Sequence, residues 1–466
     1  MTHSPSAHSP TVGPLARPRL PVNPIGLPPG PRGVPKLGIL PELSRAPLPF
    51  FMRQREIFGD YVTLPFGQGT VILISSPEGA KQVLQDHAAQ YMKGRGHQLL
   101  RSLLGNGLLT AEGPLWLSQR RLAQPSFSRT RLAAMASGME EVTRAVLLPR
   151  LEAAARTGAP LDLAPVMMEA ALGIVLRALF GTELAQADYQ AVERAMPSVL
   201  GRAVTRTRNP LSFEIFTPAV VRGVRGERAL KAVVDRLIAG RRIQIQQTGA
   251  ALDEHWGEDL LGTYMGAGMD DEQLRDEVMT LFLAGHETTA SLLTSLFWFL
   301  GQHPVWLDAV QAEARALSGP VSEQTRSLKL LDACLSETLR LSPPAWAVPR
   351  WCLEEDEVAG YRIPAGVGVM ISPYVMHRHP DHWERPEVFD PQRFLDFGRV
   401  PAAFMPFGGG PRQCIGNHFA LLEAGVVAAS VLREYRLTPT KGGPLEMLPS
   451  ITLRPKSGAM VRVERA

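Results

Sequence analysis

Cysteine is scarce in this chain: three of its 466 residues carry a thiol, Cys334, Cys352 and Cys414. A low and odd count excludes a disulfide-stapled scaffold and is typical of a reducing compartment. We therefore expect unpaired cysteines and a cytoplasmic protein.

An excess of charge is also lacking. Lysine and arginine number 49 against 45 aspartates and glutamates, which leaves a net charge of +4. This balance gives no global case for a nucleic-acid partner. Arginines gather only locally, at Arg202, Arg206, Arg208, Arg222, Arg225 and Arg228. Such a cluster is most often a solvated helix face, and the alternative is a basic lid that makes peripheral contact with a membrane.

The first 25 residues hold no apolar stretch that would suit a signal peptide or a membrane span. They are instead rich in Pro, Ser and His. We expect a disordered leader over residues 1–26 and no transmembrane anchor. No linker-like stretch divides the remainder, so residues 27–466 are expected to form a single domain.

Helical periodicity dominates the chain after about residue 130, whereas strand patterns are short. Residues 61–66 and 70–74 are predicted to be two strands around a turn. Residues 361–366 and 367–371 are predicted to pair with each other around a Pro-Gly turn. The expected fold class is mainly α with small β-sheets (α+β).

One long apolar run, over residues 274–301, resembles a membrane span in length. As a helix it would be about 42 Å long, and Asp270 supplies an N-cap. His286 and Glu287 in its middle make membrane insertion costly, so we predict a helix buried in protein. The His-Glu pair is not a zinc-peptidase motif, because Ala290 stands where a second histidine is required.

The most distinctive stretch, residues 407–416, reads Phe-Gly-Gly-Gly-Pro-Arg-Gln-Cys-Ile-Gly, and a helical pattern follows it to about residue 435. The free N–H groups of a helix start favour a thiolate at Cys414. The glycines let the backbone approach a flat partner. A thiolate presented in this way is a suitable axial ligand for haem iron. The alternative is a buried structural cysteine beside a glycine turn.

This loop resembles the cysteine-ligand loop of the cytochrome P-450 superfamily, the haem-thiolate monooxygenases, whose pattern is Phe-x-x-Gly-x-Arg-x-Cys-x-Gly. The five fixed positions are filled by Phe407, Gly410, Arg412, Cys414 and Gly416. The resemblance covers residues 27–460 and points to the soluble bacterial type. It implies haem b (iron protoporphyrin IX) bound by these residues, with Cys414 as the metal ligand. It also implies the P-450 fold, a triangular helical prism around a buried haem.

Residues 284–289 read Ala-Gly-His-Glu-Thr-Thr and are similar to the family's oxygen-activation element, Ala-Gly-x-Glu-Thr-Thr. The resemblance implies that Gly285 leaves room for dioxygen, Thr288 hydrogen-bonds it and Glu287 feeds protons inward. A carboxylate and a hydroxyl so placed can protonate dioxygen and drive O–O cleavage. The substrate pocket is implied to include Phe282, Ala284, Ala347 and Val348.

Two further motifs are implied to hold the haem propionates. Trp116 and Arg120 are four residues apart, so they share a helix face, and they resemble the Trp-x-x-x-Arg pair that packs on the haem and binds a propionate. Arg350 is implied to make a second propionate contact. His377 has either a propionate or a structural role.

A structural clamp is implied by Glu337 and Arg340, which resemble the family's Glu-x-x-Arg motif and would close on Arg393. The family text before that arginine is Pro-Glu, and Gln392 replaces the glutamate here. We expect the clamp to survive, because the arginine itself is kept.

Together these motifs predict a monooxygenase that inserts one oxygen atom from O2 into a C–H bond of a hydrophobic substrate. A carotenoid or other terpenoid is favoured, and a fatty acid is second. Two alternatives are a peroxide-dependent peroxygenase, which would not need the Glu287–Thr288 pair, and a non-catalytic haem-binding protein.

Electrons are expected from outside the chain, because no flavin or iron–sulfur domain is recognisable in it. They would pass from NAD(P)H through a reductase and a separate ferredoxin or flavodoxin. Arg120, Arg121 and Arg412 are expected to contribute to docking of this acidic partner. The enzyme is expected to be a monomer.

Overall fold

The computed structural model describes residues 26–67, 69–208, 217–247, 259–397, 400–456 and 458–466. The predicted leader, apart from Gly26, therefore lies outside the described residues. The helices are α1 Leu40–Arg45, α2 Pro47–Phe58, α3 Pro77–Lys81, α4 Arg95–Leu104, α5 Gly113–Ala123, α6 Arg129–Val142, α7 Leu148–Thr157, α8 Leu163–Phe180, α9 Gln186–Arg208, α10 Pro218–Gln247, α11 Leu260–Gly266, α12 Asp271–Gln302, α13 Pro304–Arg315, α14 Val321–Gln324, α15 Lys329–Leu341, α16 Pro373–Met376, α17 Gln392–Asp396 and α18 Asn417–Glu434.

The strands are short and fall into four small sheets among the described residues. They are β1 Tyr61–Phe66, β2 Gly69–Ile74, β3 Tyr91–Lys93, β4 Leu161–Asp162, β5 Val348–Cys352, β6 Asp356–Val358, β7 Tyr361–Ile363, β8 Gly368–Ile371, β9 Tyr435–Pro439, β10 Met447–Pro449, β11 Leu453–Pro455 and β12 Met460–Arg465. The largest sheet has the order β1-β2-β8-β5-β3, and the others are β4-β12-β9, β10-β11 and β6-β7. This is a mainly helical fold with small β-sheets, as predicted.

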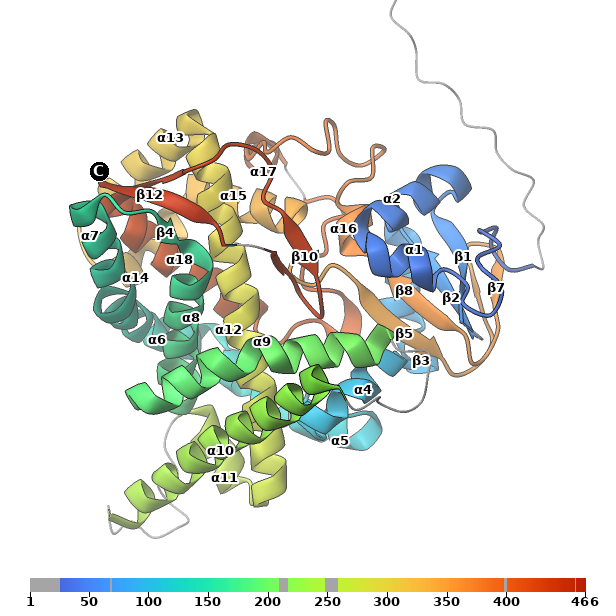
Figure 1. Cartoon of the computed structure of the whole chain (residues 1–466), viewed down its shortest axis with the longest axis horizontal. Coiled ribbons are helices and arrows are strands. Elements are labelled where there is room, and N and C mark those ends of the chain that lie inside the picture. The colour runs from blue at the N-terminus through green and yellow to red at the C-terminus, as the bar shows by residue number, and fades with distance from the viewer. Residues whose placement is uncertain (1–25, 68, 209–216, 248–258, 398–399, 457) are drawn as a thin grey trace, which may run out of the picture.

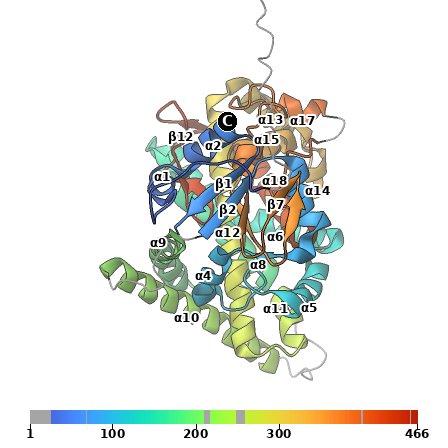
Figure 2. The ribbon, with the colours of Figure 1, turned by 90° about the vertical axis from the view of Figure 1, so that its right-hand side faces the viewer.

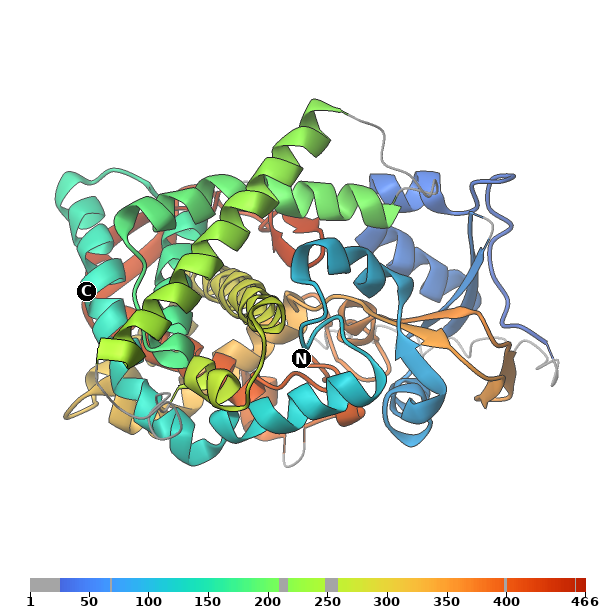
Figure 3. The ribbon, with the colours of Figure 1, turned by 90° about the horizontal axis from the view of Figure 1, so that it is seen from below.

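The long central helix α12 is the organising element of the structure. It begins as predicted, with the Asp270 side chain accepting a hydrogen bond from the Gln273 N–H at 2.8 Å, which satisfies one of the unpaired donors of the first turn. The helix runs through the middle of the molecule in Figure 1 and is seen end-on, surrounded by other elements, in Figure 3. Burial among these elements explains its apolar composition.

The helix α8 packs along α12 and belongs to the same core. By length and composition it is the one described helix that could cross a membrane, with a mean hydropathy of 1.8, and 61% of its window is buried inside the protein. Burial against α12 accounts for its apolar composition without a bilayer.

The five-stranded sheet lies at the end of the molecule away from α7 and β12 in Figure 1. In Figure 2 its strands β1 and β2 face the viewer beside α1 and α2. The predicted β1–β2 hairpin is present, with Tyr61 opposite Ile74. The helix α2 covers this hairpin, because Phe50 and Phe51 belong to one buried cluster with Val62.

The predicted pairing within residues 361–371 is wrong. The strand β7 pairs with β6, whereas β8 lies parallel to β2 and antiparallel to β5. The chain after the Pro-Gly turn therefore leaves β7 and joins the large sheet, where β8 lies between β2 and β5.

Candidate active site

The loop before α18 holds Cys414 by backbone contacts. The Cys414 N–H donates to the Phe407 carbonyl at 3.0 Å. At Gly410, φ is +69° and a Cβ atom would lie 1.8 Å from the carbonyl oxygen of Leu84, so only glycine fits. At Gly416, in contrast, the nearest atom to an added Cβ is 3.7 Å away. Nothing within the protein requires glycine there, which is consistent with close approach of a flat cofactor.

The Cys414 thiol has accessible surface although protein encloses it, so it borders internal space. Burial raises the pKa of this thiol above its usual value, while the Gly416 N–H and the charge of Arg120 favour the thiolate. The predicted lowering of the pKa by the helix start is therefore wrong for the free thiol, because desolvation outweighs it. Iron takes only the thiolate, so binding the metal would remove the proton.

A cluster of cations lies on the side of the site formed by β3, α4 and β5. Arg350 is 7% exposed, and its guanidinium makes a hydrogen bond of 2.9 Å to the backbone carbonyl of Pro349. Burial and the nearby Arg412 lower the pKa of Arg350 to about 10. Lys93 and the neutral imidazole of His97 lie beside these arginines, and neither residue was predicted from the sequence. No motif marks them, because a lone lysine and a lone histidine carry no spacing signal.

The cluster carries more positive than negative charge. Burial lowers the pKa of Lys93 to about 7 and that of His97 to about 3, and Arg350 and Arg412 add repulsion in both cases. The Nδ1 atom of His97 is buried without a hydrogen-bond partner. The carboxylate of Glu112 pairs with the guanidinium of Arg412, at an N–O distance of 2.5 Å. The Lys93 ammonium donates to the carbonyls of Leu108 and Ala111 at 2.8 and 2.7 Å. The buried guanidinium of Arg350, bonded only to a backbone carbonyl within the part of the chain that the structure describes, fits a ligand that brings its own carboxylates, as haem does.

Trp116 and Arg120, predicted to act as a pair on the haem, contact different partners in the structure. The guanidinium of Arg412 lies over the Trp116 ring, 5.2 Å from its centroid. Arg120 donates to the backbone carbonyl of Gln413 at 2.7 Å, next to Cys414. Arg120 therefore braces the thiolate loop in this structure, and a propionate contact by Arg120 stays a prediction.

Ala284 and Thr288 retain accessible surface in the middle of α12, whose other residues there are largely buried. The Thr288 hydroxyl donates to the Ala284 carbonyl at 2.7 Å, so the two share one helix face. Phe282 was predicted to line the same pocket, and this is wrong. It is 1% exposed and packs edge-on against His286, because two residues of helix turn its side chain away from Ala284.

Gly285 lies where α12 packs closely against α8. A Cβ atom at this position would lie 2.8 Å from Cγ2 of Val175 on α8. The absent side chain therefore makes room for the close packing of α8 on α12, and the predicted role of Gly285 in leaving space for dioxygen stays a prediction.

Glu287 is 3% exposed and faces the β10–β11 hairpin, where the Nε atom of Arg454 lies 3.9 Å from its Oε1. Burial raises the pKa of this carboxyl above its usual value, and Arg454 partly offsets that effect. A carboxyl with a raised pKa keeps its proton to a higher pH than an ordinary glutamate does.

The structure brings Glu337, Arg340 and Arg393 together. Arg340 donates two hydrogen bonds to the Glu337 carboxylate, at 2.7 and 2.8 Å, and both side chains are 0% exposed. Arg393 reaches the same carboxylate at 3.2 Å. The other Arg340 donors bond the carbonyls of His377, Pro386 and Val388. Gln392 points to Asp396 and does not disturb this arrangement.

The histidines near this clamp have structural partners. The Nε2 atom of His377 accepts the Met405 N–H at 3.0 Å, and burial lowers the pKa of His377 to about 3. This neutral ring is a packing element, and its contacts leave no atom for a propionate. Among the described residues no group of three or more His, Cys, Asp or Glu side chains could hold a metal ion.

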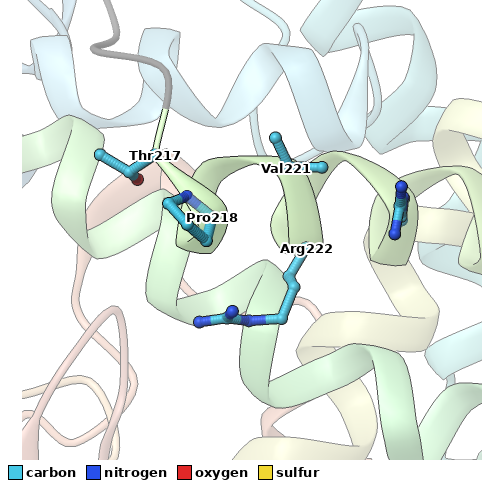
Figure 4. A pocket seen from close by; sticks show the side chains of 5 residues that line it. Thr217, Pro218, Val221 and Arg222 are labelled. Atoms are coloured by element: carbon cyan, nitrogen blue, oxygen red, sulfur yellow. The ribbon is translucent and has the colours of Figure 1, made fainter.

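The basic segment over α9 and α10 lies apart from these residues. Arg202 pairs with Glu227 at 2.6 Å, Arg222, Arg225 and Arg228 are exposed, and the side chains of Arg206 and Arg208 lie outside the described part. A surface hollow of about 380 Å³ opens at the start of α10 (Figure 4), lined by Thr217, Pro218, Val221, Arg222 and Arg225. This lining holds no acid–alcohol pair and no cysteine.

A sequence model of the cytochrome P-450 family matches residues 28–462. The chain belongs to this family. It is therefore a haem-thiolate monooxygenase that uses haem b, O2 and reducing equivalents from a redox partner. The P-450 fold accounts for the unmatched cations, the accessible thiol and the steric freedom at Gly416, all of which fit haem.

Three curated relatives are similar over most of their length. Cyclooctatin synthase of Streptomyces melanosporofaciens is 32% identical over 438 residues, which is 91% of this chain and 92% of the relative. Cyclooctat-9-en-7-ol 5-monooxygenase of the same organism is 33% identical over 430 residues, or 89% and 90%. Carotene epsilon-monooxygenase of Arabidopsis thaliana, a chloroplast protein, is 29% identical over 443 residues, or 90% and 82%.

Proposed function

We propose that this P-450 hydroxylates an apolar terpenoid or carotenoid at a C–H bond, with a fatty acid as the second candidate. The observation that carries the proposal is the accessible face of α12 at Ala284 and Thr288, which is small and apolar apart from one hydroxyl. The names of the relatives, one for a carotene and one for cyclooctat-9-en-7-ol, support the same substrate class.

The loop that leads into β5 supports an apolar pocket wall. Ala347 and Val348 are partly exposed there, and neither carries charge. Trp346 next to them is fixed by its indole N–H, which donates to the Ser450 carbonyl at 3.0 Å. Apolar walls with few polar groups are typical of sites for hydrophobic ligands.

The substrate class can be tested with purified, haem-loaded protein. We expect diterpene and carotenoid probes to shift the haem spin state and to yield hydroxylated products with NAD(P)H, a reductase and a ferredoxin. Saturated and unsaturated fatty acids form the comparison set. Spin-state shifts with small polar compounds alone would overturn the proposal for an apolar substrate.

We also infer that Glu287 and Thr288 act as the proton-handling pair of the site. Haem, when bound, supplies the centre at which O2 is held and reduced. The Thr288 hydroxyl can donate a hydrogen bond toward that centre, and the Glu287 carboxyl behind it can resupply the proton. This pair favours use of O2 over use of peroxide, because peroxide already carries its protons.

Thr288→Ala is expected to separate oxygen consumption from product formation. Without the hydroxyl, the yield of product per O2 consumed should fall on the order of tenfold or more, with peroxide released instead. The measurement pairs an oxygen electrode with product and peroxide assays.

Thr294→Ala is the matched control, because the Thr294 hydroxyl makes the same bond to a carbonyl one turn earlier, to Ala290 at 2.7 Å, in the buried part of α12. It should keep the normal yield. Equal yields in the two variants, or full turnover of the wild type with peroxide alone, would argue for a peroxygenase.

We propose a separate ferredoxin or flavodoxin as the electron donor. Arg121 is exposed on α5, which also exposes Leu115 and Leu117, and a basic, partly apolar face suits an acidic partner. Arg412 no longer belongs to this face, because it is paired with Glu112. A cytoplasmic location and a monomeric state are retained as proposals, the former supported by three free cysteines.

A further inference from the structure

The β10–β11 hairpin brings a charged residue against the acid of α12. Arg454 lies in β11, opposite Leu448 of β10, and the hairpin packs on α12. Two bonds hold the hairpin in place: the Leu453 N–H donates to the Pro344 carbonyl at 2.9 Å, and Ser450 accepts from Trp346. The guanidinium therefore reaches Glu287 from a fixed strand and not from a free surface loop.

Three polar atoms at this contact are buried and lack a hydrogen-bond partner. They are Oε1 of Glu287, Nε of Arg454 and the hydroxyl oxygen of Thr452. The 3.9 Å between Glu287 Oε1 and Arg454 Nε exceeds a hydrogen bond, so the pair is close enough to interact but not locked. Buried polar atoms without partners are costly, and such atoms in a native structure call for a functional explanation.

The charges that act on Glu287 are few among the described residues. Burial disfavours its carboxylate, and Arg454 and the Thr452 hydroxyl favour it. His286, its neighbour on α12, is buried, and burial lowers its pKa to about 4, so that ring is neutral at pH 7. Arg454 is thus the charged group that opposes burial, and 27% of its side chain remains exposed.

We infer that Arg454 is a positioning residue for the acid of this site: it holds the Glu287 carboxyl toward the hairpin and balances burial, so that the group can both release and regain a proton. This inference rests on the proposed role of Glu287.

A direct test follows the protonation of Glu287 itself. Infrared difference spectra over a pH series would be recorded for the enzyme and for Arg454→Gln, Arg454→Lys and Lys456→Gln, and the Glu287 carboxyl band is the one that disappears in Glu287→Gln. Removal of an arginine charge beside a carboxylate should raise the midpoint by about one pH unit or more. Arg454→Lys keeps the positive charge, so its midpoint should lie close to that of the wild type. A purely structural role for Arg454 would not predict this result.

Lys456→Gln is the matched control, because it removes one positive charge from the residue just after β11, where Lys456 forms an exposed pair with Glu446. Its midpoint should equal that of the wild type. An unchanged midpoint in Arg454→Gln, or an equal shift in Lys456→Gln, would overturn the inference. If Arg454→Gln does not fold, the Arg454→Lys midpoint and the control still decide between a charge effect and a packing effect.

A second readout separates this inference from the proposed function. In Arg454→Gln the product formed per O2 should fall several-fold, and its pH profile should move in the same direction as the infrared midpoint. If Glu287→Gln leaves the product yield unchanged, the proposed role of the acid is wrong, whereas the infrared shift would still report whether Arg454 controls that carboxyl. An infrared shift with no change in the pH profile of the yield would refute the positioning role.

Discussion

Replacing Glu337 with glutamine is expected to abolish accumulation of haem-loaded protein. Glu337 and Arg340 are both 0% exposed, and the glutamate is the carboxylate that neutralises the arginine. Loss of its charge leaves a buried guanidinium with carbonyl oxygens alone, which typically costs about 3–5 kcal/mol. That is a large part of the roughly 5–15 kcal/mol that holds a domain folded.

The effect should extend to the haem loop, because the same carboxylate accepts the Asp390 N–H at 2.8 Å and a hydrogen bond from Arg393. The measurements are the midpoint of urea unfolding by circular dichroism and the haem-to-protein ratio by pyridine-haemochrome assay. Arg393→Ala should have a smaller effect, since Arg393 makes one bond of 3.2 Å to this carboxylate.

Glu355→Gln is the control for loss of a carboxylate as such. Glu355 forms an exposed pair with Arg362, with about half of each side chain accessible, and such solvent-screened pairs contribute little to stability. A Glu337→Gln protein that unfolds at the same urea concentration as Glu355→Gln and retains its haem would refute the clamp.

The sequence predicted best what depends on local spacing. The cap at Asp270, the buried course of α12 and the meeting of Glu337 with Arg340 all follow from residues within one or two helical turns. The Cys414 loop was recognisable from its ten-residue pattern, although the contact that requires glycine at position 410 is with Leu84, far away in the chain.

What failed depends on partners far apart in the chain. The parallel pairing of β8 with β2 joins strands about 300 residues apart, and no local pattern encodes it. The contact of Gly285 with Val175 of α8 was likewise beyond what spacing around position 285 could indicate. Lys93 and His97 become meaningful only beside Arg350, which reaches them through the β3–β5 pairing. Sequence patterns report which face a residue occupies, whereas the tertiary fold decides what that face meets.

Cys414→Ser is expected to give a folded protein that has lost the P-450 spectrum and its monooxygenase activity. The side chain of Cys414 makes no contact that the fold depends on; its loop is held through backbone bonds such as that from the Cys414 N–H to Phe407. Serine preserves those bonds, so stability should change by about 0.5 kcal/mol or less. The hydroxyl cannot replace a thiolate as the axial ligand, because its proton is far less readily lost.

The measurement is the Soret band of the ferrous protein with carbon monoxide, together with product formation. Cys352→Ser provides the matched comparison, since Cys352 is buried and its thiol donates to the carbonyl of Glu354 at 2.7 Å, a bond that a serine hydroxyl can also donate. We expect the thiolate-type band in Cys352→Ser and its complete loss in Cys414→Ser. The two cysteines form a fair comparison because burial raises the thiol pKa of both. They differ in accessibility, since Cys414 is accessible and Cys352 is buried. A thiolate band that survived in Cys414→Ser would place the iron ligand elsewhere and remove the basis for the haem site described above.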